Sequence, residues 1–202
     1  WKRYHKKKDK ELYHVNMSEL MGSTAQSELF GSKRGAFTDA VDREGLIEEG
    51  RDKTIFLDEI GNLKIEGQYA LLGLIENGTY KKMGDPKIIS IDTQIIAATN
   101  KDINDSDKFA QDLKDRFDIQ ISLPPLREHM DDLPILAEHF ITKHSSDNGL
   151  LILSDDVYSE LLMKYNWPGN VRELEKYIKK LSRKFGAREI SYNDIIEGKM
   201  EI

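Results

Sequence analysis

The chain has 202 residues, of which 39% are hydrophobic and 33% are charged, a balance typical of a globular protein and not of a disordered one. Its formal net charge of −6 gives no overall attraction to nucleic acid, so any such contact requires a local basic patch. The lack of cysteine excludes a disulfide framework and a thiolate metal site. No apolar run reaches the roughly 18 residues of a membrane span, and no secretory signal is evident, so we expect a cytoplasmic protein.

The chain begins with a strongly basic stretch, residues 1–10 (WKRYHKKKDK). We interpret it as the solvated end of a helix. A nucleic-acid patch is the alternative, but the run is short and stands alone in the sequence.

Four short segments rich in apolar residues predict β-strands. Runs that are apolar on both faces favour buried strands of a parallel sheet, and two prolines end the last segment. The segments are ELYHVN (11–16), KTIFLDEIGN (53–62), DTQIIAATN (92–100) and DIQISLPP (118–125).

Helical patterns separate these strands. The segment IEGQYALLGLIENG (65–78) predicts a helix that ends at Gly78, and YKKMGDPKIIS (80–90) predicts a hairpin that turns at residues 84–86. Strands that alternate with helices indicate an α/β fold with an open, mostly parallel sheet flanked by helices. We expect one buried stripe on the first helix, formed by Tyr69, Leu71, Leu72 and Ile75.

The sequence becomes helical after Leu126, with segments 131–149, 154–166, 170–186 and 191–199. We therefore predict an α/β subdomain over residues 1–127 and a small all-α subdomain over residues 128–202. Asn170, with Glu173 three residues later, resembles a capping box at the start of the third helix.

Two acids follow the second predicted strand, in TIFLDE. The carboxyl ends of parallel strands form the edge at which open α/β sheets bind ligands. At that edge Asp58 can hold a magnesium ion, directly or through water, and Glu59 can orient or deprotonate an attacking water. The alternative is that two acids simply end a strand and begin a turn.

The next strand ends in AATN, which places Thr99 and Asn100 at the same edge if the two strands are parallel neighbours. The amide of Asn100 can hold a nucleophilic water or a phosphate oxygen there. A side chain that only caps a turn is the alternative interpretation of Asn100.

Two arginines are candidates for phosphate contact. Arg116, in DLKDRFD, has a planar guanidinium that suits phosphate oxygens and can stabilise charge on a transferring phosphoryl group; its alternative is a surface salt bridge with Asp112 or Asp115. Arg172, in WPGNVRELE, lies in the first turn of a helix, where a cation opposes the helix dipole. A bound phosphate explains that position, and an ion pair with Glu175 is the alternative.

The segment GSKRGAFTDA (31–40) places Phe37 among small and polar residues that offer its ring little to pack against. Such a phenylalanine either faces a partner protein, as aromatic residues at interfaces do, or folds back onto its own domain. The surrounding glycines allow the loop to bend.

Together these strings resemble the central AAA+ ATPase domain of bacterial enhancer-binding proteins, which activate transcription by sigma-54 (sigma-N) RNA polymerase. The resemblance spans residue 12 to the end of the chain, with the matching strings in the family's order and roughly its spacing. They are SELFGSKRGAFTDA, TIFLDEIGN, IIAATN, LPPLRE and WPGNVRELE.

The resemblance implies an ATPase that uses ATP and Mg²⁺. By it, Asp58 serves the magnesium ion in a Walker B strand, Glu59 polarises the water, and Asn16 restrains Glu59 until the substrate is engaged. Thr99 and Asn100 match the nucleotide sensor of the sheet. The resemblance further implies that Arg116 is an arginine finger acting in a neighbouring subunit of a ring, usually a hexamer, and that Arg172 is the nucleotide sensor of a helical lid.

The same resemblance assigns the loop. Residues Gly35, Ala36, Phe37, Thr38, Asp39 and Ala40 (GAFTDA) are similar to the family's GAFTGA loop. That loop rises when ATP is bound and contacts sigma-54, mainly through its phenylalanine and threonine. The implied partners are sigma-54 factor and RNA polymerase, whereas sequence-specific DNA contact is expected from a domain outside these residues.

Three departures from the family stand out. No phosphate-binding G-x-x-x-x-G-K-[ST] loop occurs in the sequence. The family places this loop, with the first strand of the sheet, before the position of Trp1. The segment GLIEEGRDKT (45–54) has the two glycines but continues with Arg51 and Asp52, so we do not interpret it as this loop. Asp39 replaces the second glycine of GAFTGA, although aspartate tolerates left-handed backbone better than most residues. Ala110 stands where the family often has a second intersubunit arginine.

These departures leave three hypotheses open. The first is an ATP-driven module that remodels the sigma-54 closed complex. Asp39 motivates the second, an AAA+ ATPase with a different client protein. The missing phosphate-binding loop motivates the third, a non-catalytic interaction domain.

Overall fold

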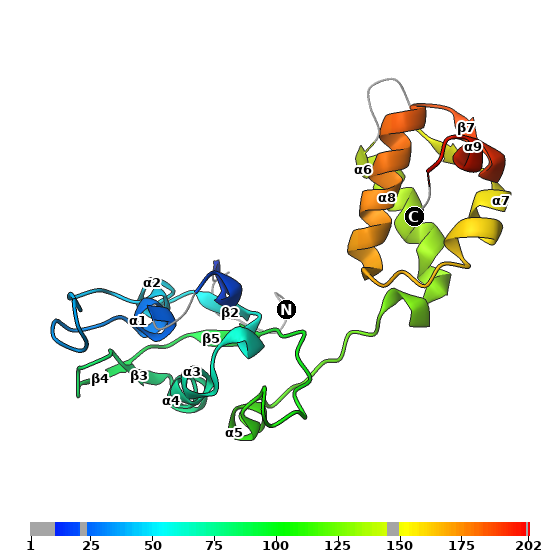
Figure 1. Ribbon diagram of the computed structural model, residues 1–202. Helices are drawn as coiled ribbons and strands as arrows, with labels where there is room; N and C mark the ends of the chain where they lie inside the picture. The colour runs from blue at the N-terminus through cyan, green and yellow to red at the C-terminus, as the bar shows by residue number, and fades with distance from the viewer. Residues whose placement is uncertain (1–10, 21–23, 145–149, 201) are drawn as a thin grey trace. The chain divides into compact units, whose positions relative to one another are not determined.

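The computed structural model describes residues 11–20, 24–144, 150–200 and 202. The basic stretch at residues 1–10 lies outside the described residues. The chain forms two compact units, Trp1–Gln120 and Ile121–Ile202, shown in Figure 1. No described helix is both long and apolar enough to cross a bilayer.

The first unit is built on three parallel strands, β1 (Leu12–Asn16), β2 (Thr54–Asp58) and β5 (Gln94–Ala97), in the order β1-β2-β5. These confirm three of the predicted strands. The central strand is almost fully buried, with Ile55 and Leu57 inaccessible to solvent, as expected for a parallel strand covered on both faces.

The fourth predicted strand is wrong. Residues 118–125 form no strand and pair with no described segment. Ile119, Ile121 and Leu123 are 79%, 79% and 87% exposed. A lone extended segment leaves its backbone groups without ladder partners, so its alternating apolar pattern cannot form a strand by itself.

Short helices surround the sheet: α1 (Ala25–Phe30), α2 (Leu46–Glu49), α3 (Ile65–Ala70), α4 (Leu72–Asn77) and α5 (Gln111–Lys114). The predicted helix over 65–78 is two segments, α3 and α4, and it ends as expected at Gly78, whose φ is 63°. The predicted stripe is partly wrong, because Tyr69 is exposed whereas Gln68, Leu71 and Leu74 are buried. The segment 45–54 contains α2 and no phosphate-binding loop.

The predicted hairpin is confirmed. Strands β3 (Thr79–Lys81) and β4 (Ile88–Ser90) pair antiparallel. Gly84 adopts a φ of 74° in the turn between them, a conformation that glycine reaches without steric cost.

The second unit is helical, as predicted. It contains α6 (Leu133–His144), α7 (Asp155–Val157) with the π-helical turn Tyr158–Leu162, α8 (Asn170–Phe185) and α9 (Tyr192–Glu197). This unit also contains a two-residue parallel pair of strands, β6 (Ile152–Leu153) and β7 (Glu189–Ile190). Its core is centred on fully buried side chains, among them Leu133, Ala137, Trp167, Leu174, Ile178 and Leu181.

The predicted capping box at Asn170 is wrong. Asn170 adopts a φ of 55°, and its side-chain oxygen accepts a hydrogen bond from the backbone of Leu126 at 3.0 Å. Glu173 accepts instead from the backbone N–H of Gly169 at 2.8 Å. The side chain of Asn170 therefore bonds to Leu126 and does not cap the start of α8, where the local sequence pattern had placed it.

Trp167 anchors this unit. Its ring is fully buried, packs edge-on against Tyr165 with centroids 5.1 Å apart, and donates from Nε1 to the carbonyl of Leu162 at 2.9 Å. The side chain therefore contributes both apolar burial and a satisfied polar group.

We predict that Trp167→Ala lowers the free energy of unfolding of this unit by about 3–5 kcal/mol, because the cavity is too large to collapse. Trp167→Phe keeps most of the ring volume and loses the indole bond, so the loss should be about 1–3 kcal/mol. Urea unfolding followed by circular dichroism at 222 nm measures both. Equal losses in the two variants would contradict this account.

Candidate functional site: the strand ends and the exposed loop

The three parallel strands end at one rim of the sheet. The register pairs Asn16 with Asp58 and Leu57 with Ala97, so the residues that follow β2 and β5 emerge side by side. The backbone confirms this closeness beyond the strands, because Ile60 donates to the carbonyl of Ala98 at 3.0 Å. Asp58, Glu59, Thr99 and Asn100 therefore lie at neighbouring positions of one edge.

The turn after β2 is tightly packed against the turn after β5. Glu59 adopts a left-handed backbone with a φ of 57°, which is uncommon for a side chain of its size. At Gly61 a Cβ atom would lie 2.5 Å from the hydroxyl oxygen of Thr99 and 2.6 Å from Cγ of Lys101. The glycine of the DEIGN string thus allows the two turns to approach each other.

Glu59 is held by Asn100. The Asn100 side-chain amide donates to one carboxylate oxygen of Glu59 at 3.2 Å, and the Asn100 backbone N–H donates to the other at 3.4 Å. Charge-assisted bonds to both oxygens fix the direction of the carboxylate. Thr99 does not join this contact, since its hydroxyl accepts from the backbone of Lys101 at 3.1 Å.

Asn16 has different partners from those that the resemblance implies. Its side-chain oxygen accepts from the backbone of Ser18 at 3.0 Å, and its amide donates to Glu19 at 3.3 Å. These bonds cap the short 3-10 turn Met17–Glu19. No hydrogen bond between Asn16 and Glu59 is found in the described part of the chain, so the restraint of Glu59 by Asn16 stays a prediction.

Asp58 contacts a residue that the sequence reasoning missed. His14 Nε2 lies 3.3 Å from Oδ2 of Asp58, and the His14 ring stacks on Phe56 with centroids 5.3 Å apart. Both neighbours follow from the parallel register, which pairs His14 with Phe56. The sequence of β1 alone does not indicate this contact, because His14 comes close to Asp58 only when β1 pairs with β2.

The rim offers oxygen ligands of the kind that Mg²⁺ prefers. Among the described residues no group of three His, Cys, Asp or Glu side chains could form a complete metal cage. Mg²⁺ seldom uses such a cage and is usually held by one or two carboxylates together with water and substrate phosphates. A site built on Asp58 therefore fits this ion if a phosphate supplies further ligands.

The two candidate arginines lie in different units. Arg116 follows α5, and its Nε lies 3.4 Å from a carboxylate oxygen of Glu76. Arg116 therefore forms a surface salt bridge, as the alternative interpretation expected, but its partner is Glu76 and not Asp112 or Asp115. Arg172 is exposed in the first turn of α8. It does not pair with Glu175, whose carboxylate binds Lys143 at 2.7 Å and His144 at 3.1 Å.

The GAFTDA segment lies in a loop between α1 and α2 that is closed at its base (Figure 1). Ser32 and Arg43 exchange backbone hydrogen bonds at 3.1 and 2.9 Å, and Lys33 donates to the carbonyl of Met83 at 2.9 Å. A Cβ at Gly84 would lie 2.5 Å from that of Ala36. The β3–β4 hairpin therefore supports the loop from one side.

The tip of the loop is exposed. Phe37 is 42% accessible and Thr38 is exposed, whereas Ala40 is buried and donates to the carbonyl of Phe37 at 3.0 Å. This exposure favours a partner-facing Phe37 over one folded onto its own domain. Asp39 has a φ of 64°, so the residue in place of glycine keeps the left-handed backbone, as expected.

Glu48 of α2 accepts several hydrogen bonds. The hydroxyl of Tyr80 donates to it, and Arg51 donates from Nε at 3.0 Å and from a terminal nitrogen at 2.6 Å. The Tyr80 bond, followed by the Arg51 contacts, holds the pKa of Glu48 below its usual 4.5, against the opposing effect of burial. Burial and the same bond raise the pKa of Tyr80.

Comparison with known proteins gives two family matches. Residues 2–122 match the Sigma-54 interaction domain, and residues 127–198 match the AAA+ ATPase lid domain. The chain belongs to the sigma-54 interaction domain family. The predicted fold is thereby confirmed as an AAA+ parallel sheet flanked by helices, followed by a helical lid.

The relatives are transcription regulators. The chain is 36% identical over 203 residues to the DNA-binding transcriptional regulator NtrC of Azospirillum brasilense, covering 98% of this chain and 42% of that protein. It is 40% identical over 179 residues to the Nif-specific regulatory protein of Azospirillum lipoferum, covering 86% of this chain and 29% of that protein. The chain thus spans less than half the length of these relatives.

A solved structure supports the fold. The crystal structure of NtrX from Brucella abortus in complex with ADP has a TM-score of 0.75 to this chain at 22% identity, and the match covers 92% of this chain and 43% of NtrX. Another crystal structure of NtrX, in complex with ATP, has a TM-score of 0.74 at 23% identity, over 91% of this chain and 44% of NtrX.

We predict that the bond between Tyr80 and Glu48 makes the stability of the first unit depend on pH. Because the folded pKa of Glu48 lies below its usual 4.5, this stabilisation is present above about pH 4.5 and is lost as pH falls through the folded pKa. Glu48→Gln should cost about 1.5–3 kcal/mol at neutral pH and little in acid. Urea unfolding at neutral and acidic pH measures the difference.

Tyr80→Phe is the matched control, because it removes only the hydroxyl of the same bond. The double variant should lose less than the sum of the single losses. A penalty for Glu48→Gln that is unchanged between neutral and acidic pH would show that the carboxylate charge is unimportant.

Proposed function

We propose that this chain is the ATP-hydrolysing motor domain of a sigma-54-dependent transcription activator, which remodels the closed complex of sigma-54 RNA polymerase. One observation carries the proposal: a single compact unit holds a rim of oriented acidic and amide side chains and an exposed loop with Phe37 at its tip. Family membership and the AAA+ fold support the same conclusion.

At the rim, each side chain has a role that its geometry allows. Asp58 would hold Mg²⁺, which neutralises charge on the phosphates when it is bound. Glu59 would orient the attacking water and accept its proton. In the present geometry the bonds from Asn100 hold the carboxylate of Glu59, so nucleotide binding would have to exchange them for bonds to water or phosphate.

ATP binding requires a phosphate-binding loop, which we propose lies before the position of Trp1, as the family arranges it. Two features support a missing strand beside it. Strand β5 is an edge of the described sheet, with Ile96 37% exposed. The extended segment 119–123 also exposes an apolar residue at every second position, so it could pair as a strand only if a neighbouring strand were present.

We propose that the two candidate arginines also contact ATP. In the proposed ring, a hexamer as is usual in the family, Arg116 would leave Glu76 and reach ATP bound by a neighbouring subunit. Arg172, for which the described residues provide no ion pair, would contact the phosphates of its own subunit. The ring would work in the cytoplasm, where sigma-54 RNA polymerase is found.

We propose that ATP binding raises the loop and hydrolysis withdraws it. The loop has a firm base, formed by Ser32, Arg43 and Met83, and a tip that can bend. At Gly35 the φ is 86° and, apart from its chain neighbours, no heavy atom lies within 4 Å of where a Cβ would be, so there is open space beside the tip at this residue. Phe37 and Thr38 would make the contact with sigma-54.

The first test is ATP turnover by the full-length protein with Mg²⁺. Glu59→Gln removes the proton acceptor and should lower turnover about 100-fold or more, with ATP affinity changed little. Glu66→Gln is the control, because Glu66 is an exposed acid of α3 and is not one of the candidate rim residues. Turnover and open-complex formation by sigma-54 polymerase are measured on each variant.

Absence of ATP turnover by the unmodified protein would favour the non-catalytic interaction domain. Turnover without open-complex formation would favour a different client. Phe37→Ala tests the contact of the loop tip with sigma-54 separately from ATP hydrolysis. This variant should abolish open-complex formation and leave basal ATP turnover unchanged.

A second candidate function, an AAA+ ATPase with a different client, rests on Asp39. Its carboxylate adds negative charge beside Phe37 at the exposed tip, and a client with complementary positive charge would benefit from it. The left-handed backbone of Asp39 means that glycine fits the position equally well.

We predict that Asp39→Gly leaves the loop conformation and ATP turnover unchanged and changes only partner affinity. If sigma-54 is the client, the variant should bind it at least as tightly as the unmodified protein, in a pull-down with an ATP analogue. Background binding by both proteins would support the different client. Asp42→Gly, at the loop base near Lys33, is the control for loss of a charge.

A further inference from the structure

The second unit has an uneven distribution of charge. Residues 121–202 contain 11 Lys and Arg and 14 Asp and Glu, a formal net charge of −3. Within this acidic unit, the segment 176–188 (KYIKKLSRKFGAR) contains six basic residues and no acidic one. Basic charge is therefore concentrated on a small part of the unit.

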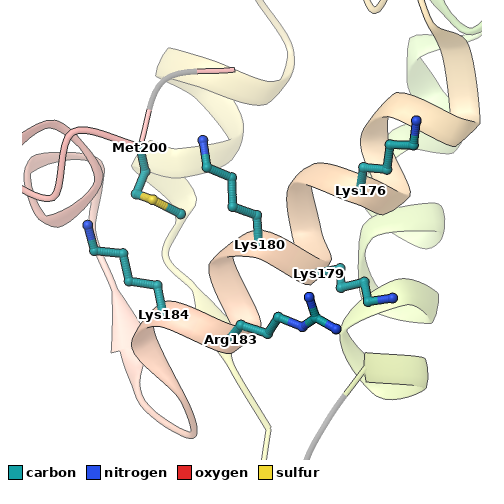
Figure 2. Close-up of a pocket in the computed structure, with 6 residues that line it drawn as sticks. All are labelled: Lys176, Lys179, Lys180, Arg183, Lys184 and Met200. Atoms are coloured by element: carbon teal, nitrogen blue, oxygen red, sulfur yellow. The ribbon is translucent and has the colours of Figure 1, made fainter.

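Helix α8 gathers this charge on one face. Its buried residues Leu174, Tyr177, Ile178 and Leu181 form the core side. At 3.6 residues per turn the basic residues fall on the opposite side. They line a shallow pocket of about 500 Å³ with Met200 as its apolar member (Figure 2). We call Lys176, Lys179, Lys180, Arg183 and Lys184 the basic face.

The basic face differs from other charged positions of the unit. Lys143, Lys164 and Arg188 lie 2.7, 2.6 and 3.3 Å from a carboxylate of Glu175, Glu160 and Asp194, respectively. By contrast, no ion pair of Lys176, Lys179 or Arg183 occurs within the described ranges. Three adjacent cations without a carboxylate repel one another, and a polyanion would relieve that repulsion.

The spacing of the face suits a phosphate backbone. From position 176 to position 184 the helix rises about 12 Å, and duplex DNA carries one negative charge per about 1.7 Å of its axis. The face can therefore meet several phosphates at once. Lysine binds phosphate as a point charge and reads no base pattern, and no aromatic side chain lines the pocket to stack on single-stranded bases.

An acidic protein fits the same surface less well. Protein interfaces usually have an apolar or aromatic centre and few lysines, whereas here four of the six lining residues are lysine and Met200 is the only apolar one. The overall charge of −6 opposes binding to DNA in general, so a contact requires a local patch such as this one.

We propose that the basic face of α8 binds the phosphate backbone of duplex DNA without base-sequence preference. This contact is independent of the proposed ATP hydrolysis and of the loop. It would hold the lid close to DNA and add to any sequence-specific contact made elsewhere in the protein.

The test compares two triple variants of the full-length protein. Lys176→Gln/Lys179→Gln/Arg183→Gln removes three charges from the face. Lys64→Gln/Lys81→Gln/Lys87→Gln removes three charges from exposed positions of the other unit. Both change the net charge equally. Binding to a labelled duplex of arbitrary sequence is measured by fluorescence anisotropy over a range of salt concentrations.

We expect the face variant to bind about tenfold or more weakly at about 0.1 M salt and to lower the slope of log K against log salt by about 2–3, since each lost phosphate contact lowers it by about one. The control should stay within about twofold. Equal losses in both triples would overturn the proposal, because net charge would then explain them.

Two further arms identify the ligand. If the face variant loses binding to polyglutamate but not to duplex DNA, the partner is an acidic protein and the proposal is wrong. If inorganic tripolyphosphate displaces DNA from the unmodified protein and the face variant equally, the face is not the phosphate site. The double variant Lys176→Gln/Arg183→Gln keeps half-buried Lys179 and should show the same trend, which guards against misfolding.

Discussion

The parallel pairing of β1, β2 and β5 is the constraint on which the candidate site depends. Its register sets Asn16 opposite Asp58 and Leu57 opposite Ala97, so β2 and β5 end within one residue of each other. The turns that follow can therefore exchange the backbone bond from Ile60 to Ala98 and bring Asn100 to the carboxylate of Glu59. A shift by one residue would turn every side chain of the shifted strand to the other face and separate the residues of this rim.

The loop depends on the same unit in a different way. Its base is bonded to the β3–β4 hairpin through Lys33 and Met83, and α2 is bonded to β3 through Glu48 and Tyr80. Its tip has few contacts of its own. A rigid base and a sparsely packed tip are typical of segments that move in function while the scaffold stays unchanged.

The lid has a separate core, built around Trp167 and the apolar side of α8. Packing requires only that the side of α8 away from this core be polar. The residue types on that side are therefore not constrained by folding and can be selected for binding. In this chain that side carries the basic face, formed by Lys176, Lys179, Lys180, Arg183 and Lys184. The lid can therefore combine the nucleotide contact that we propose for Arg172 in the first turn of α8 with a basic face further along the same helix.

The sequence by itself determined the three paired strands, the hairpin, the helical second unit and the family, because each rests on local periodicity or on distinctive strings such as GAFTDA and TIFLDE. It also anticipated the left-handed Asp39, since backbone preference is a local property. Only the tertiary structure decided the rest. Asp58 contacts His14, Glu59 contacts Asn100, and Arg116 contacts Glu76. The partners in these pairs are 40 to 44 positions apart in the sequence, and no local pattern encodes such pairings. The failed strand at 118–125 has the same physical reason: a β-strand exists only when a neighbour accepts and donates its backbone hydrogen bonds.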